Sequence, residues 1–489
     1  MGELFIDGAW RPAADGGVRG LINPATGREF AQVSEAGPQE ARAAVAAARA
    51  AFQDHRWSGR SPHERARVLL RIAELIEHDA DQLAHAETVD TGKTLSESRT
   101  DVQDVAACFR YFAELVAIPS TRTVASAPEG VHSEVRREPV GVCALITPWN
   151  YPLLQIAWKL APALAAGNSV VIKPSELTPM TTIHLVRLVQ ASGVPAGVVN
   201  LVLGAGPVVG EELARSDDVD FVSFTGGVAT GRHIGAVASG RIARVALELG
   251  GKNSNIVFAD ADYEAALDFA LNAAFFHSGQ VCSAGSRLLI EAPLHDRFVT
   301  DLAARVDAIR VGDGFDQRSQ VGPMISAAQR DRTERYVQIG LNEGATLRAG
   351  GRRPEDPALR DGYFYRPTLL DGCHAGMQVV RDEIFGPVLT VETFTDEAEA
   401  VRLANDTVYG LAGGVWTSDG ERAERVAAAL RCGTVWINDF HPYVPGAEWG
   451  GYKLSGVGRE LGPTGLAEYQ EIKHVWRRDQ PQPSGWFSN

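Results

Sequence analysis

The chain has few cysteines for its length, and none of them is spaced for a disulfide framework or a zinc site. Its 489 residues contain five, namely Cys108, Cys143, Cys282, Cys373 and Cys432, an odd number without a Cys-x-x-Cys pair. Disulfide scaffolds and zinc ribbons require closely spaced, paired cysteines. The sequence therefore predicts no metal site, a reducing compartment and a cytoplasmic location.

Long hydrophobic runs and excess positive charge are also lacking. The segment Met1–Trp10 has no basic stretch followed by an apolar core, and no apolar run approaches the ~18 residues that span a bilayer. The 47 basic and 61 acidic residues give a net charge of -14, which repels nucleic acid and anionic membranes. We therefore expect neither partner, whereas a cationic substrate would be attracted.

Helix and strand patterns alternate along the chain, as in α/β proteins. A helix is predicted over Pro38–Phe52, and another begins at Ser61, with Pro62 at its first position and Glu64 completing a capping box. Strands are predicted at Val140–Ile146, Ser169–Ile172, Val198–Leu203 and Asp220–Phe224. Such alternation indicates βαβ crossovers and a parallel sheet with helices on both faces.

A second α/β unit is predicted to begin after Glu248. The pattern resumes with a strand at Asn255–Phe258, a helix at Tyr263–Phe276 and a strand at Arg287–Ile290. The polar, strand-like stretch Ser120–Pro139 interrupts the first unit and is expected to form an excursion or arm. Glu248 would then lie at the seam between two units, where small-molecule sites are common.

One thiol and one carboxylate in glycine-flanked segments carry the candidate chemistry. Cys282 lies in Gly279-Gln280-Val281-Cys282-Ser283, and Glu248 begins Glu248-Leu249-Gly250-Gly251-Lys252. A thiolate adds to a carbonyl carbon, and a carboxylate can later take a proton from water. Alone, each residue is more often an inert buried cysteine or a solvated glutamate.

Several other short segments are typical of nucleotide-binding sites. The glycines of Gly204–Gly210 and of Phe224-Thr225-Gly226-Gly227-Val228-Ala229-Thr230-Gly231 follow predicted strands and would let backbone amides approach a phosphate. Lys173-Pro174-Ser175-Glu176 offers a cation and a carboxylate at the end of a strand, although a surface Lys/Glu pair is the alternative. Asn150 could donate an amide hydrogen to an oxyanion or simply form a turn between prolines.

Together these segments resemble the aldehyde dehydrogenase superfamily over nearly the whole chain, and within it the betaine-aldehyde dehydrogenase branch. The resemblance implies an α/β fold of two doubly wound parallel-sheet domains with a small β oligomerisation arm. It implies that Cys282 is the nucleophile, Glu248 the general base, Asn150 an oxyanion donor and Lys159 a supporting residue. Gly227 departs from the serine that many relatives carry. The implied cofactor-binding residues are Ile146, Thr147, Pro148, Trp149, Lys173, Ser175, Glu176, Gly206, Gly210, Phe224, Thr225, Gly226, Gly227, Thr230, Gly231, Leu249, Glu383 and Phe385.

The resemblance also implies a substrate and a domain plan. An aromatic box for a trimethylammonium group is expected from Tyr151, Trp158, Phe276, Tyr443 and Trp449. The implied domains are an NAD-binding domain (1–119 and 139–250), a catalytic domain (251–450), and an arm with the C-terminal segment (120–138 and 451–489). The arm is expected to pair across subunits with the region near Leu466–Trp476, giving a homodimer or homotetramer.

The expected reaction is oxidation of betaine aldehyde to glycine betaine with NAD, and NADP is left open because Lys173 lies beside Glu176. An ω-aminoaldehyde such as 4-aminobutanal, or a general aldehyde, is the alternative substrate. A cysteine hydrolase that pairs Cys282 with His277, and a non-catalytic binding protein with the same fold, are the alternatives from other classes. Both would leave the nucleotide-binding segments without a role.

Overall fold

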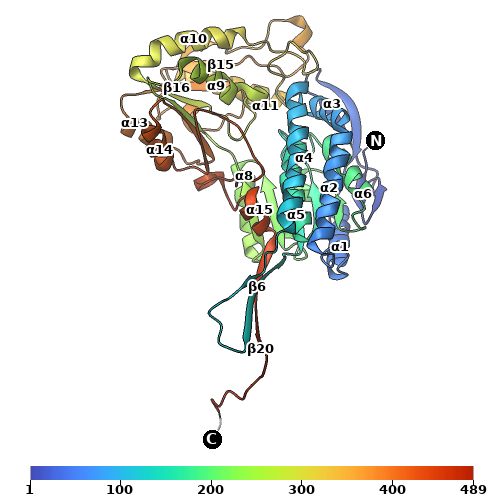
Figure 1. The fold of residues 1–489 in the computed structure, drawn as a ribbon. Coiled ribbons are helices and arrows are strands. Elements are labelled where there is room, and N and C mark those ends of the chain that lie inside the picture. The colour runs from blue at the N-terminus through green and yellow to red at the C-terminus, as the bar shows by residue number, and fades with distance from the viewer. Residues whose placement is uncertain (1, 488–489) are drawn as a thin grey trace.

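The computed structural model of the chain describes residues 2–487. It contains two large sheets, a three-stranded arm that projects from the body, and a short two-stranded hairpin (Figure 1). Helices α1 to α6 gather around the first sheet, and α9 to α14 around the second (Figure 1). The expected α/β fold with two sheets is confirmed.

The first sheet has five parallel central strands and antiparallel edges. Its order is β19 (Gly456–Val457), β11 (Arg244–Glu248), β10 (Phe221–Thr225), β7 (Val142–Ile146), β8 (Ser169–Lys173), β9 (Val199–Leu201), β1 (Leu4–Ile6) and β2 (Ala9–Arg11). The four predicted strands are confirmed, with ends shifted by one to three residues. The sequence pattern does not predict β11, because its five residues begin and end with a charged side chain.

The second sheet is parallel except at one edge. Its order is β14 (Thr346–Ala349), β15 (Thr368–Asp371), β16 (Val388–Phe394), β13 (Arg287–Glu291), β12 (Ser254–Val257), β17 (Ala412–Trp416) and β18 (Thr434–Ile437). The strands predicted after Glu248 are β12 and β13, and the predicted helix between them is α9 (Tyr263–Phe275). The short strand β19 belongs to the first sheet, although the sequence places its residues with the arm and C-terminal segment.

The remaining helices follow the strands in chain order. They are α1 (Pro38–Gln53), α2 (Pro62–His78), α3 (Ala80–Thr91), α4 (Leu95–Ala117), α5 (Pro152–Ala166), α6 (Met180–Ala191), α7 (Glu211–Arg215), α8 (Val228–Gly240), α10 (His295–Ala308), α11 (Ala327–Asn342), α12 (Gln378–Arg381), α13 (Glu397–Asn405), α14 (Gly420–Ala429) and α15 (Gly462–Glu468). The predicted capping box is confirmed, because Ser61 Oγ accepts from the Glu64 amide and Glu64 Oε2 accepts from the Ser61 amide.

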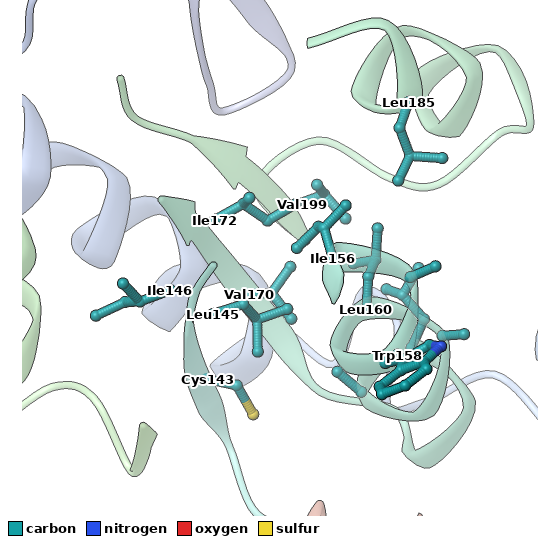
Figure 2. Close-up of a cluster of buried hydrophobic side chains, with 14 of the residues drawn as sticks. Cys143, Leu145, Ile146, Ile156, Trp158, Leu160, Val170, Ile172, Leu185 and Val199 are labelled. Atoms are coloured by element: carbon teal, nitrogen blue, oxygen red, sulfur yellow. The ribbon is translucent and has the colours of Figure 1, made fainter. Parts of the chain in front are cut away.

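Helix α5 forms the centre of the first unit, because all of its residues are buried. It packs between the sheet strands β7 and β8 on one side and α2 and α4 on the other. Figure 2 shows Ile156 and Leu160 of this helix near Val170 and Val199 of the sheet. A helix apolar on every side must be enclosed in this way. Both the helix and the sheet are therefore rigid supports for the loop between β7 and α5.

The arm consists of β5 (Arg122–Thr123), β6 (Val131–Pro139) and β20 (Gln470–Arg478). The predicted strand-like excursion is thus confirmed. The expectation that it pairs with the C-terminal region of another subunit is wrong, because β6 and β20 pair antiparallel within one chain, from Pro139 opposite Gln470 to Val131 opposite Arg478. Pairing within one chain is possible because both strands join the body at the same point (Figure 1). The hairpin β3 (Val18–Asn23) and β4 (Arg28–Ser34) forms the separate two-stranded sheet.

Candidate active site

A cavity of about 240 Å³ brings the thiol and the carboxyl of the two candidate segments together. Its wall comes from the end of β7, the ends of β10 and β11, the loop before β13, helix α11 and the loop after α12. The lining residues are Pro148, Trp149, Asn150, Gln155, Thr225, Gly226, Gly227, Glu248, Leu249, Gly250, Cys282, Gln329, Arg332, Glu383 and Phe385. Groups that are up to 237 positions apart in sequence, Pro148 to Phe385, therefore share one space.

The loop that carries Cys282 is held by hydrogen bonds on several sides. It follows a short 3-10 helix, Phe276–Gly279 (η2), in which His277 and Ser278 have positive φ angles of 47° and 56°. Ser278 Oγ donates to the Gly322 carbonyl at 2.7 Å, and Asn253 Nδ2 donates to the Cys282 carbonyl at 2.9 Å. Strained backbone of this kind persists only where its surroundings hold it.

The Cys282 thiol is in its neutral form. Burial raises its pKa to about 12, and the nearby carboxyl groups of Glu248 and Glu383 act in the same direction. Because only the thiolate is a strong nucleophile, the cysteine needs a base that takes its proton as it attacks.

Glu248 is the carboxyl that the cavity offers as a base. It is the last residue of β11, and within residues 2–487 neither carboxyl oxygen has a hydrogen-bond partner. Burial raises its pKa well above the usual value, and the neighbouring Glu460 raises it further. A Cβ at Gly450 would lie 2.9 Å from Glu248 Oε1, so only glycine leaves room for the carboxyl group there.

Lys159 lies behind the cavity wall and is not among the residues that line the cavity. Its ammonium is completely buried in α5, forms an ion pair with Glu460, and donates to Thr225 Oγ1 at 2.7 Å. Its positive charge lowers the pKa of Glu248 against the effects of burial and of Glu460. Lys159 thus influences the cavity through its charge and through Thr225.

The far end of the cavity contains the aromatic and acidic residues assigned to the nicotinamide end of the cofactor. The rings of Trp149 and Phe385 meet edge to face with centroids 5.3 Å apart. Glu383 Oε1 accepts from the Gly251 amide at 3.1 Å, and burial raises the pKa of Glu383 to about 7. Ile146 and Thr147 end β7 and lead into this wall without lining it.

The glycine-rich segment after β10 lies between the cavity and helix α8. Phe224 ends close to Gly226, where a Cβ would lie 2.5 Å from the phenyl ring, so this turn requires glycine. Gly227 caps α8, and a Cβ there would have no heavy atom within 4 Å. Gly231 packs against Leu249, whereas Thr230 is exposed. The N-terminus of α8 is thus open toward a ligand phosphate.

The remaining predicted cofactor residues lie around a separate, narrow hollow. Ser175 and Glu176 line it, and Lys173 Nζ contacts Glu176 Oε2 at 3.2 Å. Gly206 and Gly210 are the ends of a π-helical turn, and Lys173 Cδ lies 3.9 Å from the position of a Cβ at Gly210. The structure therefore divides the predicted cofactor residues between two neighbouring sites of the first sheet's carboxyl edge.

Of the five residues predicted for the aromatic box, three contact one another. The ring centroids of Trp158 and Tyr443 are 5.6 Å apart, those of Tyr443 and Trp449 are 4.9 Å apart, and those of Trp158 and Trp449 are 6.3 Å apart. Trp436 stacks on Trp449 at 6.3 Å. Tyr443 bonds to Ser283, the residue after Cys282. These three rings, Trp158, Tyr443 and Trp449, are called the aromatic trio below.

The other two predicted box residues pack elsewhere. Phe276 pairs with His441 at 6.0 Å. Tyr151 has the Lys93 ammonium 3.7 Å from its ring centroid and His277 at 5.4 Å. One face of Tyr151 is therefore already occupied by a cation of the protein itself. Glu448, a further candidate for cation preference, instead bonds to Thr464 on the surface.

Helix α11 supplies two cavity residues that the sequence does not predict. Gln329 Nε2 donates to the carbonyls of Ile384 and Phe385 at 3.1 and 2.7 Å, and Arg332 Nη2 donates to the Glu383 carbonyl at 2.7 Å. They hold a turn in which Phe385 has a positive φ of 59°. No motif marks these two residues, because they act on main-chain carbonyls that a sequence pattern cannot locate.

His277, the partner in the alternative of a cysteine hydrolase, does not line the cavity. Its ring packs on Tyr151, and burial lowers its pKa well below the usual value. A histidine that resists protonation and lies outside the cavity is unsuited to pair with Cys282. Glu248 is the titratable group that the structure places in the cavity beside the thiol.

The thiol, the buried carboxyl and the two glycine-rich turns of a doubly wound fold define the class of protein. The sequence matches the aldehyde dehydrogenase family over residues 10–475, and the chain belongs to that family. It is 56% identical over 486 residues to betaine aldehyde dehydrogenase from Bacillus subtilis, with 99% of each chain covered. It is 41% identical to aminoaldehyde dehydrogenase 2 from Pisum sativum, covering 99% of this chain and 97% of the relative.

The fold also matches solved structures closely. Betaine aldehyde dehydrogenase from Staphylococcus aureus, solved in complex with NAD+, has a TM-score of 0.98 and 48% identity, covering 100% of this chain and 97% of that chain. In residues 2–487, no helix is long and apolar enough to cross a membrane. The same part of the chain has no group of three or more His, Cys, Asp or Glu side chains placed to hold a metal ion.

Proposed function

We propose that the protein oxidises betaine aldehyde to glycine betaine with NAD. The observation that carries the proposal is the position of the aromatic trio, which joins the Cys282 loop through Tyr443 and Ser283. A trimethylammonium group is stabilised over ring faces by about 0.5–2 kcal/mol per contact. The names of the Bacillus subtilis and Staphylococcus aureus relatives support the same substrate.

The residues of the cavity fit the cofactor. Trp149, Glu383 and Phe385 would hold its nicotinamide riboside, the open N-terminus of α8 its pyrophosphate, and Lys173 and Glu176 its adenosine ribose. When bound, NAD accepts the hydride that leaves the substrate carbon. The other predicted cofactor residues shape these walls.

The chain's own groups would then perform two half-reactions. Glu248 takes the proton of Cys282 as the sulfur attacks the aldehyde carbon, and Asn150 with the Cys282 amide stabilises the oxyanion, about 3–4 kcal/mol per donor in comparable sites. After hydride loss a thioester remains on the sulfur. Glu248 removes a proton from water, the water attacks the thioester, and the acid leaves as Cys282 recovers its proton.

A panel of three aldehydes tests the substrate. Betaine aldehyde, its uncharged isostere 3,3-dimethylbutanal, and 4-aminobutanal have similar reach, and their initial rates are read by the absorbance of reduced nicotinamide. We expect the highest kcat/KM for betaine aldehyde. Equal turnover of the isostere would contradict the role of the aromatic trio. A preference for 4-aminobutanal would instead favour the activity named for the Pisum sativum relative.

We further propose that the arm joins subunits into a homodimer or homotetramer. Strand β20 has a free edge, and its Ile472 and Trp476 are 66% and 51% exposed. Exposed edges and apolar residues of this kind are normally covered by another chain. We retain the division into an NAD-binding domain (1–119 and 139–250), a catalytic domain (251–450) and the arm with the C-terminal segment (120–138 and 451–489), of which residues 1, 488 and 489 lie outside the described residues.

A cytoplasmic location is proposed on the cysteines, since all five are free thiols, as in a reducing compartment. The net charge of -14 likewise disfavours nucleic acid and membrane partners.

A further inference from the structure

The hollow beside Lys173 and Glu176 contains a second ion pair that none of the nucleotide-binding segments predicts. Besides Ser175 and Glu176, it is lined by Arg19 of β3 and by Glu35, the residue after β4. The N-terminal hairpin thus contributes half of the charged groups at a site formed by the first sheet. Two carboxylates and one guanidinium face the hollow, and Lys173 lies below them.

Arg19 and Glu35 form a two-pronged ion pair. Arg19 Nε contacts Glu35 Oε2 at 2.5 Å, and Arg19 Nη2 contacts Glu35 Oε1 at 2.6 Å. Glu35 Oε1 also accepts from the Ala205 amide at 3.1 Å, just before the Gly206–Gly210 turn. Arg19 has its fork occupied, and Glu35 ties the hairpin to a loop that is proposed to lie beside the cofactor.

Lys173 is engaged in the same manner. Its ammonium is almost completely buried and donates to the Pro174 carbonyl at 3.0 Å and to Glu176 Oε2 at 3.2 Å. Burial alone would raise the pKa of Glu176, but Lys173 and a backbone hydrogen bond hold it below its usual value. Glu176 is therefore ionised at neutral pH, and both cations of the hollow already have a carboxylate partner.

We propose that the Arg19–Glu35 pair helps the enzyme to discriminate between NAD and NADP, with Glu35 as a positioning residue that keeps Arg19 from a 2′-phosphate. The proposal rests on the proposed function, which places the adenosine ribose at Lys173 and Glu176. A 2′-hydroxyl can donate to a carboxylate and displaces no ion pair. A phosphate monoester adds about -1.5 to -2 charges beside two carboxylates and must displace one to reach a cation.

Freeing Arg19 is the direct test. In Glu35→Gln the amide oxygen can still accept from the Ala205 amide, but the charge that holds Arg19 is gone. We expect the ratio of kcat/KM with NADP to that with NAD to rise about tenfold, as one charge-assisted hydrogen bond allows. Adding Arg19→Met to this variant should remove the gain. The control Glu29→Gln changes an exposed carboxylate of the same hairpin, bonded to Gln32, and should leave the ratio unchanged.

A binding measurement separates cofactor recognition from catalysis. Adenosine 2′,5′-bisphosphate and AMP compete for the adenosine site, and only the former should bind about tenfold tighter to Glu35→Gln than to the native enzyme. A general loosening of the fold would weaken both ligands together. If Glu35→Gln does not fold, Glu35→Ser removes the same charge with a smaller side chain and is measured in its place.

Glu176→Gln distinguishes failure of this inference from failure of the ribose assignment. If Glu176→Gln strengthens bisphosphate binding but Glu35→Gln does not, the role of the Arg19–Glu35 pair is refuted and the ribose assignment stands. If neither substitution changes the preference for the bisphosphate, the ribose does not lie at this hollow, and both the assignment and the inference fall.

Discussion

Asn150 and Gln280 are joined by one hydrogen bond, from Asn150 Nδ2 to the Gln280 carbonyl at 2.9 Å. A side-chain amide has two N–H groups, so this bond orients Asn150 and leaves the second N–H for the substrate oxygen. The bond also connects the loop after β7 to the loop of Cys282. The oxyanion donor and the nucleophile are thereby kept at a constant separation.

Loss of this donor should slow the reaction strongly. We expect Asn150→Ala to lower kcat about 10²–10³-fold, the usual cost of removing one oxyanion-hole donor. Steady-state rates with betaine aldehyde and NAD provide the measurement. The exposed Asn342→Ala on α11 is the matched control and should keep the native rate. A loss of less than tenfold for Asn150→Ala would mean that other groups stabilise the oxyanion.

Cys282→Ala should abolish turnover, because no other cysteine reaches the cavity. Cys432→Ala is the control, since this thiol is partly buried at the other side of the second sheet's edge strand and donates only to the Thr434 carbonyl. It should keep native activity within about twofold, as expected for a substitution away from the site. Oxidation of aldehyde by Cys282→Ala at a native rate would refute the covalent mechanism.

Glu248→Gln separates the two half-reactions. If Glu248 activates the hydrolytic water, the variant should still produce a burst of reduced nicotinamide and then stall as a thioester, with kcat down about 10²–10⁴-fold. Stopped-flow absorbance measures the burst, and mass spectrometry detects the acyl group. Absence of a burst would show that Glu248 is already required for the attack of Cys282.

The raised pKa of Glu248 predicts a pH dependence of deacylation. A base acts only when deprotonated, and burial holds Glu248 protonated above its usual pKa of 4.5. Deacylation should therefore speed up as pH rises through neutrality and level off above the raised pKa. Single-turnover release of the acid at several pH values measures this rise. In Glu248→Gln the slow residual step should not follow the same curve.

Removing a ring of the aromatic trio should affect the charged substrate selectively. We expect Trp449→Ala to raise KM for betaine aldehyde about 3- to 30-fold, equivalent to about 0.5–2 kcal/mol of cation–π stabilisation. KM for 3,3-dimethylbutanal should change much less, because it has the same shape without the charge. Equal losses for both substrates would assign Trp449 to shape alone.

Much of the site can be predicted from sequence because its chemistry is local. The segments around Cys282 and Glu248 each combine a reactive side chain with glycines, and the strands that end at Ile146, Lys173 and Thr225 are short β-rich runs. Residues that act through the main chain escape such a search. Gln329 and Arg332 lie on a helix with no special pattern and are recognised only by the carbonyls to which they donate.

Predictions about partners in space were less reliable than predictions about residue types. Five aromatic residues were equally good candidates for one box, yet Phe276 pairs with His441 and Tyr151 packs on Lys93, while Trp436 joins the trio. Likewise, the arm strand and the C-terminal strand were correctly linked, but they pair within one chain.

The order of strands and helices and the identity of the reactive groups follow from the amino-acid sequence, because hydrophobic periodicity and side-chain chemistry are properties of neighbouring residues. The charge state of those groups is decided by the fold. Glu248 and Cys282 stay neutral because burial removes water from them, while Glu176 stays ionised because Lys173 lies beside it. Burial and pairing depend on residues hundreds of positions away, which only the tertiary structure brings into contact.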